Sequence, residues 1–407
     1  MLTSPFHPRT HVLATSYAWK EWAGYAAVCH YMPHSEAEVF AVRSAAGLLD
    51  ITPLYKYDVT GPDAAVFLSR IWTRDISKIG RGRVVYSAMC DERGFVLDDG
   101  TVARIGESHF RCTSSEPWLS WFLSHSRGFD VEIEETTDVI CGLALQGPRA
   151  RAILKGITEF DMDKMRFFRM RYTTVGGVPA WVSRTGYTGD LGYEIFCANE
   201  HALALYDAIT EAGEPHGMIP MGLDALDVAR IEAGFVLQGI DYITAKDCII
   251  DDLKSTPDDA GLGWTVDLDR APFIGQSAIK AERERGSVWD LVGLELSWEG
   301  LEALYADHSL PPHLVPEACR SAVPVYSESG EQVGQVTSSV WSPTTKRYLA
   351  LAQVRRPNNE LGTTLYVEHT PMFARCKVEA TVVEKPFYDP PRKRSVPESP
   401  AAAEEAS

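Results

Sequence analysis

The sequence predicts an α+β fold followed by a C-terminal antiparallel β domain. Helical and strand-like patterns alternate up to about residue 285, whereas the later segments are short alternating runs separated by turn residues. A chain of 407 residues can bury several cores, so two or three compact units are expected. We therefore predict an interleaved α+β region at 1–285, a small β-barrel or sandwich at 286–388 and a disordered tail at 389–407.

The first half begins with a helix that is followed by paired strands. The segment TGPDAAVFLSRIW at 60–72 has Pro62 near its start and apolar residues at helical spacing. The segment GRVVYSAMCDERGFVL at 82–97 changes to β-branched and aromatic residues, with a turn expected at Gly94. This region therefore combines helix and sheet.

A second helix is marked at both of its ends. In NEHALALYDAITEAGEP at 199–215, Asn199 is a candidate N-terminal cap, and Gly213 with Pro215 is a stop signal. Apolar residues between these signals share one face, which predicts an amphipathic helix packed on a core.

The pattern of apolar and polar residues in the last third predicts an antiparallel β domain. Five stretches carry short alternating runs: WDLVGLEL, VPVYSESGEQVGQVTSS, RYLALAQVRR, TTLYVEH and CKVEATVVEKPF. A helical, proline-rich excursion at 298–320 interrupts them; we expect it either to shape one side of a site, toward a substrate or toward solvent, or only to cover the barrel. The final residues lack the apolar content to pack, which predicts the tail.

Composition limits the partners. The formal net charge of -17 argues against a nucleic acid or an anionic membrane, because either would require a basic face. An anionic small ligand remains compatible if a few arginines gather locally. The N-terminus lacks the apolar run of a signal peptide and no segment reaches transmembrane length, so we expect a soluble cytoplasmic enzyme.

Cysteine and histidine spacing indicates neither disulfides nor a metal. The eight cysteines are scattered without a Cys-x-x-Cys pair, and we interpret them as reduced thiols. The eleven histidines form no ligand cluster, so no metal site is predicted. Phosphate-loop, zinc-protease and serine-hydrolase motifs are also missing from the sequence.

The stretch SRTGYTGDLGYEIF at 183–196 is the first candidate for chemistry. Three glycines permit unusual backbone conformations or close approach, while Tyr187 and Tyr193 offer hydroxyls and ring faces. Glu194 lies in an apolar strand end where a carboxylate is unexpected. A decorated hairpin and a functional loop both remain open at this point.

Two further stretches carry charge. In FVLDDGTVAR the neighbours Asp98 and Asp99 would face opposite sides of a strand, so one of them could enter a site; the more frequent interpretation of Asp-Gly is a hairpin turn. In GLDALDVARIEAGFVLQGID, Arg230 is either a helix charge in an ordinary ion pair, the more frequent case, or a clamp on an anionic or carbonyl group.

Six segments in order resemble the aminomethyltransferase family, whose type member is the glycine cleavage system T-protein. They are GRVVYSAMCDERGFVLDDG, ALQGPRA, SRTGYTGDLGYEIF, GLDALDVARIEAGF, LGWTVDL and FIGQSAI. The resemblance implies a cloverleaf of three subdomains, the third a C-terminal antiparallel β-barrel, around a central hole that holds tetrahydrofolate. Demethylases and the folate domains of sarcosine and dimethylglycine dehydrogenases share this fold.

The resemblance also implies roles for individual residues. Asp98 matches the carboxylate beside the reactive folate nitrogens, and Glu194 matches the one that binds the pterin, with nearby glycines letting the flat ring approach the backbone. Tyr86 matches a tyrosine of the preceding strand and is assigned with Asp98 to catalysis. Tyr187 and Arg230 match residues around the folate or donor. Together with Glu194 and Tyr193 they form the predicted cofactor-binding set.

Two departures guide the expected function. The T-protein usually has an arginine where this chain has Leu226 and a tyrosine where it has Gln238. We therefore expect transfer of a methyl or aminomethyl-derived carbon from a small methylated donor to N5 of tetrahydrofolate. The alternative is a true T-protein, which takes its carbon from an aminomethyl-lipoyl carrier protein and releases ammonia. A less favoured third possibility is a non-catalytic folate-binding module.

Overall fold

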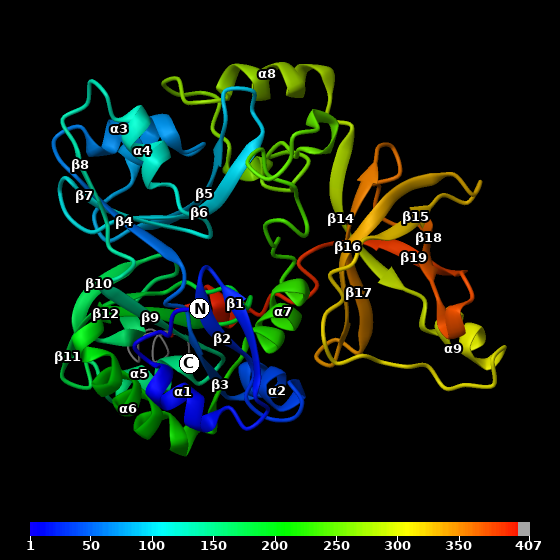
Figure 1. Ribbon diagram of the computed structural model, residues 1–407, viewed down its shortest axis with the longest axis horizontal. Coiled ribbons are helices and arrows are strands. Elements are labelled where there is room, and N and C mark those ends of the chain that lie inside the picture. Colours follow the sequence, from blue (N-terminus) through cyan, green and yellow to red (C-terminus); the bar gives the residue numbers. More distant parts are fainter. Residues whose placement is uncertain (398–407) are drawn as a thin grey trace, which may run out of the picture.

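Three lobes surround the centre of the molecule in a computed structural model that describes residues 1–397 (Figure 1). A five-stranded sheet with its helices forms one lobe and a six-stranded sheet forms the second, while the third is a closed barrel. The prediction of an α+β fold with a C-terminal antiparallel β-barrel is confirmed. Among the helices of residues 1–397, none has the length and apolar character needed to cross a membrane.

The strands of the six-stranded sheet come from two parts of the sequence, one before and one after the segment that forms the five-stranded sheet. Its order is β10-β11-β12-β9-β3-β13, and every pairing is antiparallel except that of β13 with β3. One face packs on helices α5 and α6, while the other turns toward the middle of the molecule. The bounds are β3 (Ala46–Asp50), β9 (Ile140–Gln146), β10 (Met170–Val175), β11 (Val178–Ser183), β12 (Gly192–Ala198), β13 (Met218–Pro220), α5 (Ala150–Lys155) and α6 (Ala202–Gly213).

Helix α6 is the amphipathic helix expected from the sequence, but Asn199 does not cap it. Its side chain donates to the carbonyl oxygen of Asp138 instead, at 2.7 Å. A 3-10 turn, Asn199–His201, precedes α6 and moves the start of the helix beyond the reach of that amide.

The five-stranded sheet has the order β5-β6-β7-β4-β8 and is antiparallel throughout. Buried aromatic and aliphatic residues fix helices α3 and α4 on one face. The bounds are β4 (Tyr55–Thr60), α3 (Ala64–Ile71), β5 (Val84–Cys90), β6 (Val96–Arg104), β7 (His109–Ser114), α4 (Leu119–His125) and β8 (Glu132–Glu135). The helix and paired strands predicted over 60–97 are thus present.

Helix α7, Leu223–Glu232, lies at the centre of the molecule, between the six-stranded lobe and the barrel (Figure 1). Its apolar residues share one core with strand residues of both sheets and with Val340 of the barrel. The remaining elements of this region are α1 (His7–Leu13), β1 (Ala18–Trp22), β2 (Tyr25–His30), α2 (Glu36–Ser44) and α8 (Gln276–Arg285). Helix α7 therefore shares one hydrophobic core with all three lobes.

The barrel closes in the order β14-β17-β16-β15-β18-β19. Its strands are β14 (Trp289–Leu296), β15 (Val323–Tyr326), β16 (Gln332–Ser342), β17 (Arg347–Arg355), β18 (Thr364–His369) and β19 (Cys376–Val383). The excursion at 298–320 begins with α9 (Trp298–Ala306), whose Leu301 is buried in the barrel core at the outer end of this lobe (Figure 1). Its other end returns to the centre, where Arg320 pairs with Asp227 of α7 at 2.6 Å.

The segment after the barrel does not begin as a loose tail. Residues 389–395 return to the six-stranded lobe, where the guanidinium of Arg392 pairs with Asp190 at 2.8 Å. The Arg184 guanidinium donates to backbone carbonyls of this segment, including that of Lys393 at 3.0 Å. The prediction of a tail from residue 389 is wrong for these residues, because ion pairs hold a segment that lacks apolar content. Residues 398–407 lie outside the described part of the chain.

Candidate active site

The Asp98-Asp99 pair lies inside a strand and not in a hairpin turn. Strand β6 runs without interruption through both residues, with Asp98 opposite Met89 and Asp99 opposite Ala88 on β5. Gly100 belongs to this strand because a β-carbon there would lie 2.0 Å from the carbonyl oxygen of Thr113 on β7. The turn interpretation is therefore wrong, and alternation points the two carboxylates to opposite faces.

Asp98 faces the core of the five-stranded lobe. It is fully buried and accepts hydrogen bonds from the indole Nε1 of Trp118 and the hydroxyl of Ser115, both at 2.7 Å, and from the backbone N–H of Glu116 at 3.1 Å. Burial, together with the charge of Asp99, raises the pKa of this carboxyl. With its oxygens occupied by the protein, Asp98 has no open side for a ligand.

Asp99 faces the centre of the molecule. It accepts hydrogen bonds from the hydroxyl of Tyr86 at 2.6 Å and from the hydroxyl of Tyr242, and it is only partly buried. Burial raises the pKa of Asp99, while the two phenol hydroxyls favour its charged form. The structure thus brings Asp99, and not Asp98, together with Tyr86. Sequence reasoning missed Tyr242, since nothing local to it marks a contact with β6.

The glycine-rich loop joins β11 to β12, which pair antiparallel with Ser183 opposite Glu194. β-Carbons at Gly186 and Gly192 would lie 2.0 and 2.1 Å from the side-chain oxygen of Gln146. Gln146 in turn donates to the carbonyl of Thr185 at 3.2 Å. These two glycines therefore make room for the side-chain amide of Gln146. We predicted that the glycines would let a flat ligand ring approach the backbone, and at Gly186 and Gly192 a protein side chain takes that place.

Glu194 points from β12 toward the middle of the molecule. Its Oε2 accepts a hydrogen bond from Thr185 at 2.5 Å, whereas Oε1 accepts none from residues 1–397. Burial raises the pKa of Glu194, and nearby hydroxyls oppose that shift. A partly buried carboxylate with one free oxygen is an acceptor for a ligand N–H group.

Tyr193 and Tyr187 take different positions. Tyr193 is fully buried on the opposite face of β12, in the core beneath α5 and α6, and accepts a hydrogen bond from Arg151 at 3.3 Å. Strand alternation therefore separates it from Glu194, which argues against its predicted place in the cofactor-binding set. Tyr187 stays on the central side: its ring stacks on Phe235 at 5.6 Å and its hydroxyl donates to the carbonyl of Val236.

Arg230 is occupied by the protein. Its Nε donates to Asp227 at 2.8 Å, one terminal nitrogen pairs with Asp241, and the other donates to Ser338 of the barrel at 2.8 Å. The side chain is 1% exposed. The guanidinium that was predicted to bind the folate or donor instead joins α7, the following loop and the barrel.

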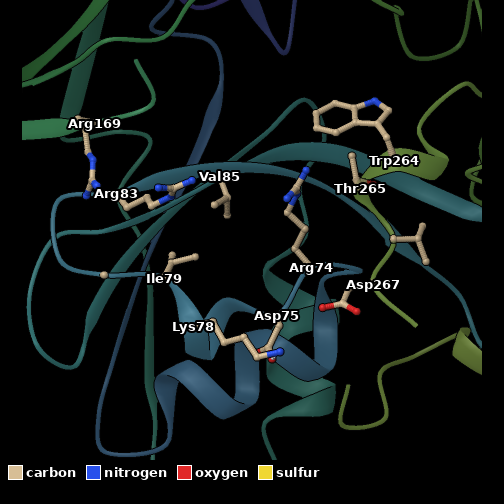
Figure 2. Close-up of a pocket in the computed structure, with 12 residues that line it drawn as sticks. Arg74, Asp75, Lys78, Ile79, Arg83, Val85, Arg169, Trp264, Thr265 and Asp267 are labelled. Carbon is tan, nitrogen blue, oxygen red and sulfur yellow. Dashed lines mark ion pairs between the residues drawn. The ribbon is translucent and has the colours of Figure 1, made fainter. Parts of the chain in front are cut away.

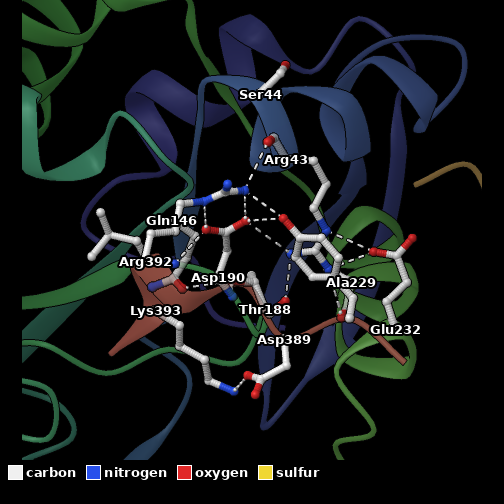
Figure 3. A network of polar contacts seen from close by, with 12 residues as sticks. Arg43, Ser44, Gln146, Thr188, Asp190, Ala229, Glu232, Asp389, Arg392 and Lys393 are labelled. Atoms are coloured by element: carbon white, nitrogen blue, oxygen red, sulfur yellow. Dashed lines mark hydrogen bonds and ion pairs between the residues drawn. The ribbon is translucent and has the colours of Figure 1, made fainter. Parts of the chain in front are cut away.

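A second polar network joins the glycine-rich loop to helices α2 and α7 and to the C-terminal segment (Figure 3). Arg43 of α2 donates to Glu232 of α7 at 2.8 Å and to the carbonyl of Thr188 at 2.8 Å. Asp190 accepts a hydrogen bond from the guanidinium of Arg392, which belongs to the C-terminal segment. Because Asp190 and Glu232 are buried and paired, the network fixes the loop that carries Tyr187 against helix α7.

The two positions that depart from the T-protein pattern lie close to this centre. The side-chain amide of Gln238 contacts the hydroxyl of Ser115, which donates to Asp98. Leu226 packs, partly buried, against the core shared by the lobes. Within residues 1–397, no three His, Cys, Asp or Glu side chains gather in a way that would hold a metal ion.

Known proteins match this chain over most of its length. The family model of the GCVT N-terminal domain matches residues 10–270, and that of the glycine cleavage T-protein C-terminal barrel domain matches residues 313–389. An aminomethyltransferase of Geobacillus sp. (strain WCH70) is 36% identical over 354 residues, which are 86% of this chain and 88% of that protein.

Two further similarities extend this picture. A trimethylamine-oxide aldolase of Ruegeria pomeroyi is 35% identical over 370 residues, which are 88% of this chain but only 43% of that longer protein. The crystal structure of the glycine cleavage system aminomethyltransferase T of Bartonella henselae superposes with a TM-score of 0.80 at 25% identity, covering 95% of this chain and 98% of that one.

Proposed function

We propose, since this chain belongs to the aminomethyltransferase family of the glycine cleavage T-protein, that it transfers the carbon of an aminomethyl-lipoyl carrier protein to tetrahydrofolate. The products are 5,10-methylenetetrahydrofolate, ammonia and the carrier with its free dihydrolipoyl thiol. The family carries out folate-dependent one-carbon transfer, and this chain is an enzyme of that family. Relatives covered over nearly their whole length are aminomethyltransferases. They support the aminomethyl donor, our alternative from the sequence, better than the small methylated donor that we placed first.

The side chains around the centre fit a folate. The free Oε1 of Glu194 is an acceptor for the N–H groups along the pterin edge. The stacked rings of Tyr187 and Phe235 offer a flat apolar surface on which a ring can pack. Glu194 and Tyr187 are therefore the residues that we propose to hold the pterin.

The observation that carries the proposal is the carboxylate of Asp99 between the hydroxyls of Tyr86 and Tyr242. Bound tetrahydrofolate supplies N5, the nucleophile that accepts the one-carbon unit. Asp99 supplies fixed negative charge next to the transferring carbon, where positive charge develops as the amine departs. The two hydroxyls hold that carboxylate in place, so no reorganisation is needed during transfer. In this role Asp99 takes the place that the resemblance gave to Asp98.

A small methylated donor remains the second candidate because of Gln238 and Leu226. These residues replace a phenol and a guanidinium at the expected donor end, and Gln238 is bonded to Ser115. The trimethylamine-oxide aldolase relative bears the name of a small methylated substrate, although this chain spans 43% of it.

Product analysis separates these functions. The purified protein is incubated with tetrahydrofolate and either aminomethyl-lipoyl carrier protein or one free methylated compound, an amine, amine oxide, betaine, sulfonium or aryl methyl ether. We expect 5,10-methylenetetrahydrofolate and ammonia with the carrier, detected by mass spectrometry. Formation of 5-methyltetrahydrofolate from a free donor would support the second candidate, and folate binding without any turnover would support the non-catalytic module.

Replacing Glu194 by Gln tests the pterin contact. The substitution keeps the shape but turns an acceptor into a donor that faces the pterin N–H groups, so we expect folate affinity to fall by about 1–3 kcal/mol. Calorimetric titration measures it, with Glu200→Gln on the exposed turn before α6 as the matched control. An unchanged dissociation constant in Glu194→Gln would place this residue outside the site.

A further inference from the structure

Two cysteines face each other in the middle of the six-stranded sheet. Cys141 of β9 lies directly opposite Cys197 of β12, and their Sγ atoms are 3.5 Å apart. No other two cysteines of residues 1–397 are joined by a contact between their sulfur atoms. Both residues belong to the core between this sheet and its helices, and neither takes part in the proposed reaction.

The backbone of this pair suits a disulfide. Directly opposite residues of antiparallel strands have Cα atoms about 4.5 or 5.5 Å apart, and disulfides span Cα separations of about 4.4–6.8 Å. Both side chains point to the same face of the sheet. A disulfide bond of about 2.0 Å therefore requires the sulfur atoms to approach by about 1.5 Å, which side-chain rotations supply while the strands stay paired.

The two thiols are not equivalent. The sulfur of Cys141 lies 3.5 Å from both the sulfur and the carbonyl oxygen of Cys197. A hydrogen bond from the Cys141 thiol lowers the pKa of the Cys197 thiol, whereas the same hydrogen bond and burial raise the pKa of Cys141. Cys197 is 4% exposed and Cys141 is fully buried. Cys197 is therefore the thiol that ionises first and meets an oxidant.

The pair lies close to one end of the sheet. Cys141 is the second residue of β9, and Cys197 is followed by Ala198, the exposed last residue of β12. Only the pairing of Ile140 with Ala198 lies beyond the two cysteines. Strand ends open locally at a lower free-energy cost than the whole fold. A small oxidant such as hydrogen peroxide therefore reaches Cys197 when this last pairing opens.

The pair is separate from the proposed active site. Alternation along β12 points Cys197 to the core beneath α5 and α6 and Glu194 to the opposite face. A cavity of about 410 Å³ adjoins the site beside β5, and none of the described residues that line it is a cysteine (Figure 2). Trp264 on its wall stacks on Tyr86 of the site at 5.8 Å. Oxidation of the pair therefore leaves the groups around Asp99 and Glu194 in place.

We infer that Cys141 and Cys197 form a reversible disulfide that locks the six-stranded sheet when hydrogen peroxide is present. The Cys197 thiolate attacks one oxygen of the peroxide, so that its sulfur becomes a sulfenic acid and hydroxide leaves. The sulfur of Cys141 then attacks the sulfur of the sulfenic acid, the S–S bond forms, and the S–O bond breaks to release water. The proton that Cys197 lost on ionisation neutralises the hydroxide. The two sulfurs together lose two electrons, and the peroxide is reduced to two molecules of water.

The cross-link closes a long segment of the chain. The two cysteines are 56 positions apart, and α5, β10, β11 and the glycine-rich loop lie between them. Cross-linking a loop of this length restricts the unfolded chain and so stabilises the fold. We therefore expect oxidation to raise the melting temperature by roughly 5 °C.

Mass spectrometry of the full chain tests the inference. The protein is treated with a small excess of hydrogen peroxide, quenched with catalase, alkylated with N-ethylmaleimide in denaturant and digested without a reductant. We expect one cross-linked pair of peptides, which joins Cys141 to Cys197, and the higher melting temperature in the same sample. Dithiothreitol should restore both thiols and the original melting temperature.

Single-cysteine variants test the order of events. In Cys141→Ala the sulfenic acid on Cys197 has no partner, so dimedone should label Cys197 after peroxide treatment, and the rise in melting temperature should be lost. In Cys197→Ala, Cys141 should stay unlabelled. Cys112→Ala is the matched control, because it removes a fully buried thiol from the five-stranded sheet and should leave both the cross-link and the rise unchanged.

Two outcomes would overturn the inference. If Cys141 and Cys197 stay fully alkylated while the exposed Cys319 is oxidised, the pair is ordinary apolar packing. A disulfide that forms without raising the melting temperature would show that it does not lock the sheet. Neither outcome depends on the proposed function, since no folate and no donor enter the experiment.

Discussion

Asp99→Asn is expected to lower kcat about 100- to 1,000-fold, the usual effect of removing one preorganised electrostatic group from a dry site. The substitution keeps the size of the side chain, turns one of its two acceptor oxygens into a donor, and removes the negative charge that we propose to face the transferring carbon. Steady-state turnover with the donor identified by product analysis measures the effect, and calorimetry establishes that tetrahydrofolate still binds.

Asp98→Asn is the matched control, because the same chemical change falls one residue away on the other face of β6. Asp98 already contacts Trp118 and Ser115 in the core, so its variant should lose stability more than turnover. Turnover should also fall as the pH drops through the pKa of Asp99, which burial raises from its ordinary value, because protonation removes the charge. If Asp98→Asn abolishes turnover and Asp99→Asn does not, the assignment of the two carboxylates is reversed.

Arg230→Met is expected to reduce the free energy of unfolding by about 3–5 kcal/mol, the cost of removing one partner from a buried ion pair. Arg230 is 1% exposed and Asp241 is fully buried, so the variant leaves a carboxylate without its guanidinium at the junction of α7 and the barrel. Urea unfolding followed by circular dichroism measures the loss.

The control for this variant shares one of its carboxylates. Arg320 also pairs with Asp227, at 2.6 Å, but its side chain is 37% exposed. Arg320→Met should therefore cost less than about 1 kcal/mol, as exposed pairs do. Equal losses in the two variants would contradict a special role for burial, and a stable Arg230→Met protein that no longer binds tetrahydrofolate would restore the ligand role predicted from the sequence.

Local patterns were sufficient to predict the α+β class and the C-terminal antiparallel β domain, whereas the resemblance to a known family implied the three-lobed arrangement. Helical spacing around α3, the two-ended signals of α6 and the alternating runs of the last third each reflect a periodicity that neighbouring residues determine. The same alternation predicted that Asp98 and Asp99 would face opposite sides, so that one of them could enter a site. It applies equally to Tyr193 and Glu194, which are adjacent in β12 and therefore cannot share a face.

The errors concern contacts between distant segments. Asp-Gly indicates a turn unless another strand needs the space, and here the carbonyl of Thr113 on β7 occupies the position of the missing β-carbon. Tyr242, from a loop, and Trp264, from the 3-10 turn Gly263–Thr265, reach the site from more than a hundred residues after β5, and no periodicity marks them. The residues around Arg230 do not distinguish it from an ordinary charged residue on the surface of a helix. Its partner Ser338 lies on the barrel, more than a hundred residues later in the chain.

The pairing of Arg392 with Asp190 sets an order of events during biosynthesis. The glycine-rich loop is translated together with most of the sheet that carries it. Arg392, which pairs with Asp190 of this loop, is translated about two hundred residues later. Domains generally fold as they emerge, N-terminal first. The nascent folate region can therefore form its sheets while the chain is still being translated, but the loop beside Glu194 acquires its final support only after the barrel and the segment behind it have been synthesised.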